Sequence, residues 1–240
     1  MHADDAGTSS SDGRNLTFGM LDRIGRAIVT GHYDDAAFPT EAHLATQHGV
    51  SRSVVREAVK MLAAKGLLTA RPRKGTTIQP ARHWNLFDPD VLRWLLERKF
   101  SLELLRQFTE LRIAIEPAAA ALAARTHNDA RLGAIVAGYQ RMVAADAGDD
   151  DVLASDIAFH VAVLEASGNP FYRQFRDVVE TALRTSIRFT NRFKGRTADL
   201  EQHRDVLDAI GRRDADGAHA AMAALIVDVR ALIATAEQEG

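Results

Sequence analysis

Residues 40–78 read TEAHLATQHGVSRSVVREAVKMLAAKGLLTARPRKGTTI, and this stretch decides the fold of the first part of the chain. Thr40 is a residue type that caps helices, and it precedes a short helical pattern that Gly49 would end. Ser51 would cap a second helix, in which apolar residues recur every three or four positions until Gly66. The pattern predicts two helices joined by a tight turn.

Two short strand-like runs after the second helix flank a basic turn made of Arg73, Lys74 and Gly75. Upstream of the quoted stretch, apolar residues at helical spacing predict a further helix that begins at Leu16. Three helices followed by a hairpin predict a winged helix-turn-helix domain over residues 16–80.

The segments on either side of this domain differ from it in composition. Residues 1–15 are small, polar and acidic, so we expect a disordered arm. Residues 81–100 predict a linker with a connecting helix that begins near Asp88 and Pro89. Alanine- and leucine-rich stretches over residues 101–237 carry apolar residues at helical spacing, which predicts a bundle of six or seven helices. The fold class is therefore mainly α, with the hairpin wing as its β element.

Charge is distributed unevenly along the chain. Between Ser51 and Arg82 there are eight basic residues and one acidic residue, a net charge of +7. Because the whole chain has a net charge of −2, the remainder carries −9. A short, strongly basic block on an acidic protein is typical of a local contact with nucleic acid.

Composition also excludes several kinds of site. The chain has no cysteine, which excludes disulfides and thiolate metal sites, so any metal must be held by His, Asp or Glu. The N-terminus lacks the apolar core of a signal peptide, and no run of eighteen uncharged apolar residues occurs. We expect a soluble, cytoplasmic protein without a membrane partner.

The second helix of the quoted stretch offers candidate DNA contacts. Arg52 and Arg56 are four residues apart on one helix face, and their planar forks match guanine in the major groove. The hydroxyls of Ser51 and Ser53, near the helix N-terminus, could bind phosphates. The alternative is a solvated basic face that binds nothing. The turn adds three candidates for the adjacent minor groove or backbone: Arg73, Lys74 and Gly75.

Two further pairs at helical spacing lie in the second half of the chain. Asp156 and His160 are spaced so that a carboxylate and an imidazole can share a cation, although an ordinary surface or capping contact is the alternative. A lone residue such as His203 is more often simply exposed. Arg112 and Glu116 are also one turn apart. Arg112 could clamp a carboxylate bidentately, and the alternative is a buried structural ion pair.

The quoted stretch resembles the winged helix-turn-helix of the GntR family over its whole length. The chain departs from the family pattern at Ala42, where many members have arginine, so one contact implied by the family is missing. The resemblance implies operator contacts at the start of the recognition helix and at the wing tip, which map to Ser51, Arg52, Ser53, Arg56 and Gly75.

The second half resembles the FCD domain of the FadR-type GntR subfamily over about residues 100–235, in ELRIAIEPAAAALAAR, in the Asp-x-x-x-His pair followed by ASGNP, and in EQHRDVLDAI. This resemblance implies a divalent metal, Zn²⁺ or Ni²⁺, bound by Asp156, His160 and His203. Leu225 stands where the family often has a fourth ligand, a histidine. Its side chain cannot ligate, which would leave a coordination position for water or an effector carboxylate.

The same resemblance implies an effector contact by Arg112. Asn169 could add a hydrogen bond, and Arg188 could reach a polyhydroxy acid, although a solvated basic face is the alternative for Arg188. The segment HWNLFDPDVLRWLLE resembles the linker of GntR regulators of sugar-acid catabolism, which implies a sugar acid such as galactonate as effector. We therefore expect a homodimeric repressor that binds a two-fold, double-stranded DNA operator and leaves it when a small acid binds.

Two other functions stay open at this point. A metal-dependent enzyme could use Asp156, His160 and His203 to activate water. No motif places a general base beside these residues, and such an enzyme would leave the DNA-reading pattern unexplained. An architectural DNA-binding protein with a purely structural dimerisation domain would need no ligand.

Overall fold

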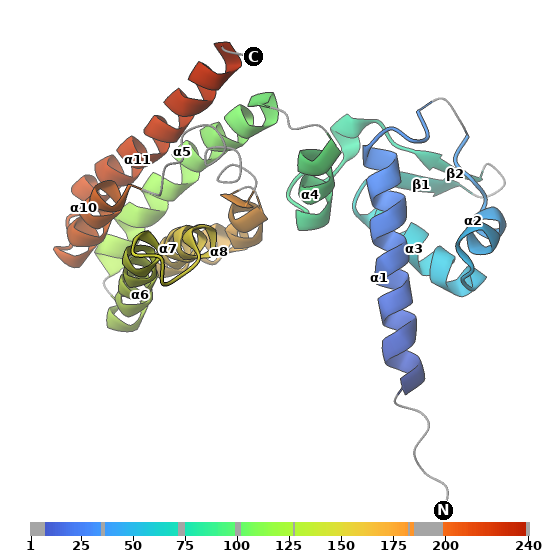
Figure 1. Ribbon diagram of the computed structural model, residues 1–240, viewed down its shortest axis with the longest axis horizontal. Helices are drawn as coiled ribbons and strands as arrows, with labels where there is room; N and C mark the ends of the chain where they lie inside the picture. Colours follow the sequence, from blue (N-terminus) through green and yellow to red (C-terminus); the bar gives the residue numbers. More distant parts are fainter. Residues whose placement is uncertain are drawn as a thin grey trace, which may run out of the picture. The chain divides into compact units, whose positions relative to one another are not determined.

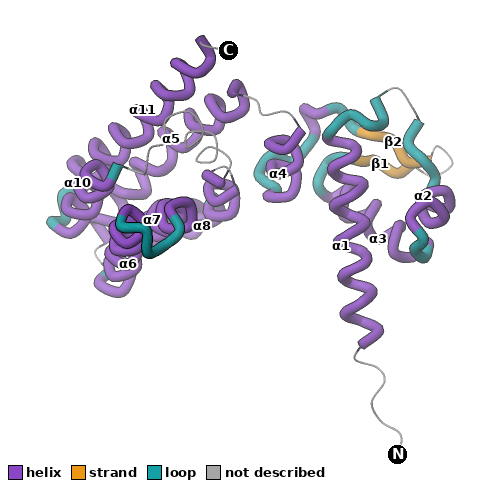
Figure 2. The backbone as a smooth tube through the Cα atoms, in the orientation of Figure 1, coloured by secondary structure: helices purple, strands orange, loops and turns teal. Residues whose placement is uncertain are grey.

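The computed structural model describes residues 8–34, 37–71, 75–98, 102–126, 128–181, 183–184 and 199–238. These residues are mostly helical and contain one two-stranded sheet (Figure 1 and Figure 2). The chain divides into two compact units, Met1–Lys99 and Phe100–Gly240. The predicted fold class, a winged helix-turn-helix followed by a helical domain, is confirmed.

The first unit follows the predicted order of helices and strands. Its helices pack on a shared apolar core built from α1, α2, α3, β1 and α4, in which Ile24, Leu44 and Leu62 are fully buried. The elements are α1 (Thr8–Val29), α2 (Glu41–His48), α3 (Arg52–Ala64), β1 (Leu68–Arg71), β2 (Gly75–Ile78), the 3-10 helix η1 (Ala81–His83) and α4 (Pro89–Arg98).

The helix ends in the first unit have the expected caps. Thr40 Oγ1 accepts a hydrogen bond from the backbone N–H of His43 at 3.2 Å, which satisfies a donor at the start of α2. Ser51 Oγ does the same for Val54 at the start of α3, at 3.3 Å. Gly49 ends α2 with a φ of 64°, a left-handed conformation that glycine adopts without strain. Short polar residues and glycine therefore fix the turn between the two helices.

The wing is an antiparallel hairpin. Leu68 pairs with Ile78 at its base, and Arg71 pairs with Gly75 next to the turn. Leu67 and Leu68 are buried, so the base of the hairpin is anchored in the core, while its far end extends away from that anchor.

Helix α1 begins earlier than the sequence pattern predicted. It starts at Thr8 instead of Leu16, which differs from the disordered arm expected over residues 1–15. A helix nucleated by a buried apolar face extends at small cost into adjoining polar residues, because each added residue gains one backbone hydrogen bond. Residues 1–7 lie outside the described part of the chain.

Helix α4 is the connecting helix predicted within the 81–100 linker, and it belongs to the first unit. Trp94 is fully buried against Gly25 of α1, where an added Cβ would lie only 2.2 Å from the indole ring. Trp94 Nε1 donates a hydrogen bond to Asp22 Oδ1 at 2.8 Å, and Arg93 Nη2 donates to the same oxygen at 2.8 Å. The small residue and the shared carboxylate hold α4 on α1.

The second unit is a helical bundle whose helices are capped by short polar side chains. Helix α5 packs along α11 and α7, α6 packs on α7, and α10 packs on α11. The elements are α5 (Leu102–Thr126), α6 (Asp129–Asp146), α7 (Val152–Ala166), α8 (Pro170–Gln174), helical residues 176–181, α10 (Leu200–Gly211) and α11 (Ala215–Gln238).

Helix α11 contains a stretch, Ala215–Thr235, that is long and apolar enough to cross a membrane by length and composition alone. Its residues Met222, Leu225 and Ile226 are buried in the core that the helices of the second unit share. A core helix of a soluble domain passes the same test, so this stretch carries no argument for a membrane.

Candidate functional site

The start of α3 presents exposed polar side chains. Ser51, Arg52 and Ser53 are all exposed, and the Ser51 and Ser53 hydroxyls lie 2.8 Å apart. Within the described part of the chain, no carboxylate pairs with Arg52. An unpaired guanidinium at the exposed start of the helix is free to bind an external acceptor such as a base edge or a phosphate.

Arg56 differs from Arg52, although both were predicted to contact DNA from one helix face. Its side chain is 57% exposed, but its Nε lies 3.2 Å from Glu41 Oε2 on α2. This ion pair joins the two helices of the helix-turn-helix. A DNA acceptor would therefore have to displace or share a carboxylate at Arg56, whereas none competes at Arg52.

The wing tip is only partly described. Gly75 is exposed and has a φ of 77°, a conformation that favours glycine. Arg73 and Lys74 lie outside the described residues, so their predicted contacts with DNA stay predictions.

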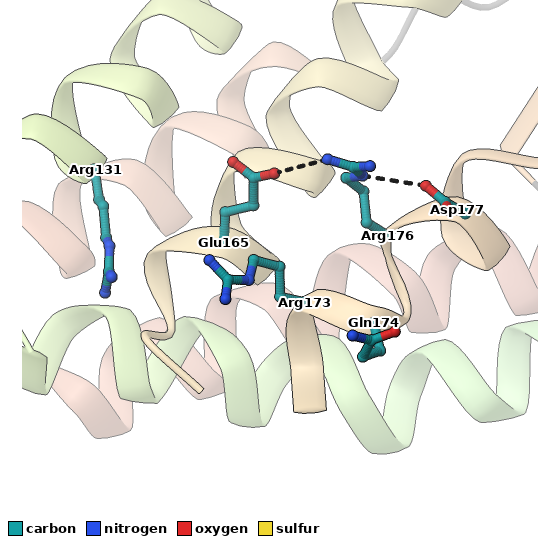
Figure 3. A pocket seen from close by; sticks show the side chains of 6 residues that line it. All are labelled: Arg131, Glu165, Arg173, Gln174, Arg176 and Asp177. Carbon is teal, nitrogen blue, oxygen red and sulfur yellow. Dashed lines mark hydrogen bonds and ion pairs between the residues drawn. The ribbon is translucent and has the colours of Figure 1, made fainter. Parts of the chain in front are cut away.

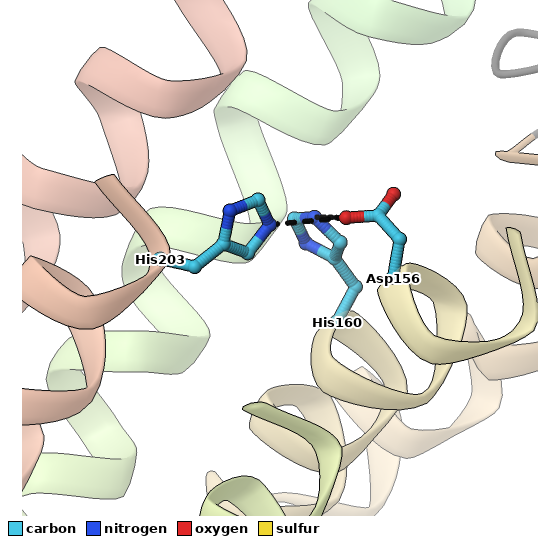
Figure 4. A group of neighbouring side chains, drawn as sticks. All are labelled: Asp156, His160 and His203. Carbon is cyan, nitrogen blue, oxygen red and sulfur yellow. Dashed lines mark ion pairs between the residues drawn. The ribbon is translucent and has the colours of Figure 1, made fainter. Parts of the chain in front are cut away.

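A buried cluster lies inside the second unit. Helix α7 places Asp156 and His160 one turn apart, and α10 supplies His203. The three side chains point toward one another (Figure 4), and their exposed fractions are 7%, 1% and 3%. The structure thus brings together the three residues that were predicted as metal ligands.

The protonation of His160 follows from its neighbour Glu116. His160 Nδ1 lies 2.6 Å from Glu116 Oε2, and an ionised carboxylate only accepts hydrogen bonds, so Nδ1 is the donor. In a neutral imidazole the other nitrogen, Nε2, then carries a lone pair. The Nε2 atom lies 3.7 Å from Asp156 Oδ1 and 3.4 Å from Arg112 Nη2.

The same reasoning leaves His203 with an unsatisfied nitrogen. Its Nδ1 lies 2.6 Å from the carbonyl oxygen of Asp199 and therefore donates to it, so Nε2 carries the lone pair. This Nε2 is buried, lies 3.0 Å from Asp156 Oδ1, and makes no hydrogen bond to any described residue. A lone pair facing a carboxylate is unfavourable in a dry interior unless a cation lies between them. A proton on Nε2 would make this contact an ion pair with Asp156, but one without an aligned N–H···O hydrogen bond.

The donor atoms fit a divalent metal. The ligand atoms that these three side chains offer lie within 4.8 Å of one another. Tetrahedral Zn²⁺ with bonds of about 2.1 Å holds its ligands roughly 3.4 Å apart, between the 3.0 Å and 3.7 Å separations found here. Each imidazole also donates a hydrogen bond from its Nδ1–H to an oxygen, the arrangement that orients metal-binding histidines.

Charge favours the same cation. Burial raises the pKa of Glu116, but the guanidinium of Arg112 and the hydrogen bond that His160 donates outweigh it and lower that pKa to about 2. Two carboxylates and one guanidinium leave a buried charge of −1 when the imidazoles are neutral. A divalent cation changes this to +1, which favours an anionic ligand.

Comparison with known protein families identifies both units. Residues 20–78 match the family described as bacterial regulatory proteins, gntR family, and residues 107–228 match the FCD domain. The chain belongs to the GntR family. The helix-turn-helix and wing lie in the first match, and the whole buried cluster lies in the second.

Relatives of this GntR regulator share most of their length with it. The galactonate operon transcriptional repressor of Escherichia coli is 31% identical over 88% of this chain and 95% of its own. An Escherichia coli protein whose name assigns it to regulation of the L-lactate dehydrogenase operon is 33% identical over 88% of this chain and 83% of its own. The solved structure of Lar from Listeria monocytogenes matches with a TM-score of 0.56 at 17% identity, over 92% of this chain and 97% of that one, and supports the fold.

Membership of the family decides against the enzyme that the sequence left open. The matched families and relatives are transcriptional regulators, not enzymes. The GntR regulator is therefore a DNA-binding protein, and its Asp156, His160 and His203 need no catalytic interpretation.

The structure places the predicted effector residues differently from one another. Arg112 is buried, with its Nε 2.5 Å from Glu116 Oε1 and its Nη2 3.3 Å from Oε2, so it forms the structural ion pair that was the alternative prediction. Its Nη2 also lies 3.3 Å from His160 Nδ1, beside the residues that were predicted as metal ligands. Asn169 Oδ1 caps α8 by accepting from Phe171 N at 2.9 Å, a local role that the sequence analysis missed. Arg188 lies outside the described residues.

Two functional partners were missed from the sequence. The contact of Glu116 with His160 was missed, whereas its pairing with Arg112 was the stated alternative, and its place one turn after Arg112 was the available signal. Glu41 holds Arg56, but no local pattern links residues fifteen positions apart. Leu225 is buried among apolar side chains, as expected for a residue that cannot ligate a metal.

Proposed function

We propose that this GntR regulator is a homodimeric repressor that binds a metal and a small hydroxy acid in its FCD domain, with galactonate as the first candidate. Binding of the acid releases the protein from its operator. One observation carries the proposal: buried His203 Nε2 has no hydrogen-bond partner among the described residues and faces Asp156 across 3.0 Å.

Asp156, His160 and His203 would hold Zn²⁺ or Ni²⁺. The ion supplies a Lewis-acid position for a carboxylate oxygen, because Leu225 cannot occupy the coordination site that a fourth ligand would fill. Glu116 holds the proton of His160 at Nδ1 and orients the ring, and the carbonyl of Asp199 does the same for His203. Arg112 adds a positive charge beside these ligands.

The names of two relatives support the ligand class. One is a galactonate operon repressor, and the other is assigned to an L-lactate dehydrogenase operon. Galactonate and lactate share a carboxylate with a neighbouring hydroxyl, which is suited to chelating one metal ion. A net buried charge of +1 with the metal in place favours an acid of this kind.

Repression requires two coupled equilibria. A dimer would place two α3 helices on two half-sites, with Arg52 at base edges and the hydroxyls of Ser51 and Ser53 at phosphates. The acid releases DNA only if it binds the released arrangement more tightly than the DNA-bound one, by a few kcal/mol. Such a protein works in the cytoplasm, where its operator lies.

The test measures thermal unfolding of the full chain with galactonate, L-lactate or acetate, each with and without a chelator. A ligand at about one hundred times its Kd adds about 2.7 kcal/mol to the free energy of unfolding. We expect galactonate to raise the Tm only when metal is present, and acetate, which lacks the hydroxyl, to have little effect. The same acid should then dissociate the protein from an operator selected from random DNA.

A matched histidine pair provides the control. His203→Ala should remove metal binding and the galactonate effect, whereas His219→Ala, an exposed position on α11, should change neither. Stabilisation by L-lactate alone would keep the hydroxy-acid class and reject galactonate. If no acid shifts the Tm, the ligand proposal fails and the architectural role is favoured.

A further inference from the structure

A second group of charged side chains lines an open cleft of about 470 Å³ in the second unit. Its volume is within the range of small-ligand sites. The lining residues come from α6, α7, α8 and the helical residues 176–181, and all six are polar or charged (Figure 3): Arg131, Glu165, Arg173, Gln174, Arg176 and Asp177.

The cleft lies on a different face of α7 from the buried cluster. Glu165 follows Asp156 by nine residues, which is roughly 13 Å along the helix axis and about half a turn around it. No residue lines both sites. A ligand in the cleft would therefore not touch the proposed metal ligands.

Charges in the cleft are unevenly paired. Arg176 Nη1 lies 3.3 Å from Glu165 Oε1, and its Nε lies 3.1 Å from Asp177 Oδ1, so this arginine has a carboxylate on each side. Arg131 and Arg173 have no carboxylate partner within the described residues. In Figure 3 their side chains end on the same side of the pair formed by Glu165 and Arg176.

The backbone beside the cleft accommodates Arg131. Gly168 has a φ of 72°, and a Cβ added there would lie 2.8 Å from Arg131 Nη1. The guanidinium therefore lies next to this glycine, whose left-handed backbone favours a residue without a side chain.

We propose that this cleft is a second anion site, which binds a small dianion such as a phosphate monoester or a dicarboxylate between Arg131 and Arg173. Each guanidinium offers paired N–H groups that match the oxygens of either group. Gln174 can hydrogen-bond a neutral part of the same molecule. Because the site is open to solvent, binding should be weak and should decrease as the salt concentration rises.

The test uses the full chain, treated with a chelator and then dialysed, so that no metal contributes to anion binding. Inorganic phosphate and succinate are titrated separately by calorimetry at low salt, which distinguishes the phosphate source from the dicarboxylate source. We expect one of them to bind, and Arg131→Ala with Arg173→Ala to weaken its association constant at least tenfold. Replacing both residues by lysine should weaken binding by less, because charge is kept and the planar fork is lost.

The control is a second double variant of equal charge. Arg204→Ala with Arg230→Ala removes two exposed arginines from α10 and α11, outside the cleft, and should leave binding unchanged. Equal losses in both double variants would mean an adventitious ion attracted by net charge only, and would overturn the proposal. So would the absence of binding by both probes, or unchanged binding in the cleft variant. None of these outcomes bears on galactonate and the metal.

Discussion

Arg52 at the start of α3 and Arg112 on α5 are the same side chain in opposite surroundings. Arg52 is exposed, and no carboxylate within the described residues pairs with it. Arg112 is 3% exposed and is bound by Glu116, which is fully buried. The first arrangement keeps a charge for a partner outside the chain, and the second uses a charge to hold other buried groups in place. Removing each arginine should therefore affect different measurements.

The largest expected effect on stability follows Arg112→Ala. This change leaves Glu116 buried without its cation, which costs about 3–5 kcal/mol of the free energy of unfolding. Urea denaturation measures the loss. Arg106→Ala on the same helix is the control: Arg106 lies on the surface with Glu103 and Glu110, and such pairs contribute about 0–1 kcal/mol. Equal losses in the two variants would contradict a special role for the buried pair.

Arg52→Ala should leave folding unchanged and weaken operator binding by about 1–3 kcal/mol, because a base contact is lost. Fluorescence anisotropy with a selected operator measures the affinity, and Arg204→Ala, exposed on α10, is the control. Arg56→Ala should cost less than Arg52→Ala, since Glu41 already engages Arg56. If the two variants lose the same affinity, the ion pair with Glu41 does not limit Arg56.

Glu116→Gln should lower the affinity for Zn²⁺ about 10- to 100-fold, because the charged oxygen that accepts from His160 Nδ1 is replaced by a neutral one. Competition with a chromophoric chelator measures the affinity. Glu110→Gln, exposed on the same helix, should leave it unchanged. Circular dichroism must show that the variant is folded, since it also removes the anionic partner of Arg112. An unchanged affinity in the folded variant would reject Glu116 as a positioning residue.

The smallest expected effect is a pH dependence in the first unit. Burial raises the pKa of Asp22, but hydrogen bonds from Trp94 and Arg93 outweigh it and bring the net pKa below the usual 3.8. Because the pKa of Asp22 is lower in the folded protein than in the unfolded chain, ionised Asp22 stabilises the fold above about pH 4. This stabilisation is lost as the pH falls. In a Trp84→Phe variant, where Trp94 is the remaining tryptophan, the fluorescence of Trp94 should change as the pH falls through this range. Adding Asp22→Asn should make the fluorescence nearly independent of pH in the same range. If the fluorescence of the two proteins depended on pH in the same way, Asp22 would be excluded as the group that titrates.

Local chemistry explains what the sequence predicted. Thr40, Gly49 and Ser51 act on backbone groups within a few residues, so the helix-turn-helix could be placed from its caps. Asp156 and His160 share a helix face by spacing alone. The approach of His203 came only through the family resemblance, because it lies on another helix.

Contacts between distant positions could not be predicted. Glu41 with Arg56, Glu116 with His160, and Arg131 with Gly168 each join residues whose proximity depends on how helices pack. The early start of α1 at Thr8 results from propagation of a helix that begins at a buried face. The residue preferences in 8–15 do not predict this extension. Packing rather than propensity decided these features.

The packing of Trp94 against Gly25 affects how hybrid regulators can be built. In such a hybrid, the DNA-binding unit of one protein is joined to the ligand-binding domain of another. A junction after residue 80 would follow the predicted domain end, but it would strip Val91 and Trp94 from the core they share with α1. A junction after residue 98 would carry α4 along with its partner helix. Hybrids joined at the later point should express as folded protein, and those joined at the earlier point should aggregate.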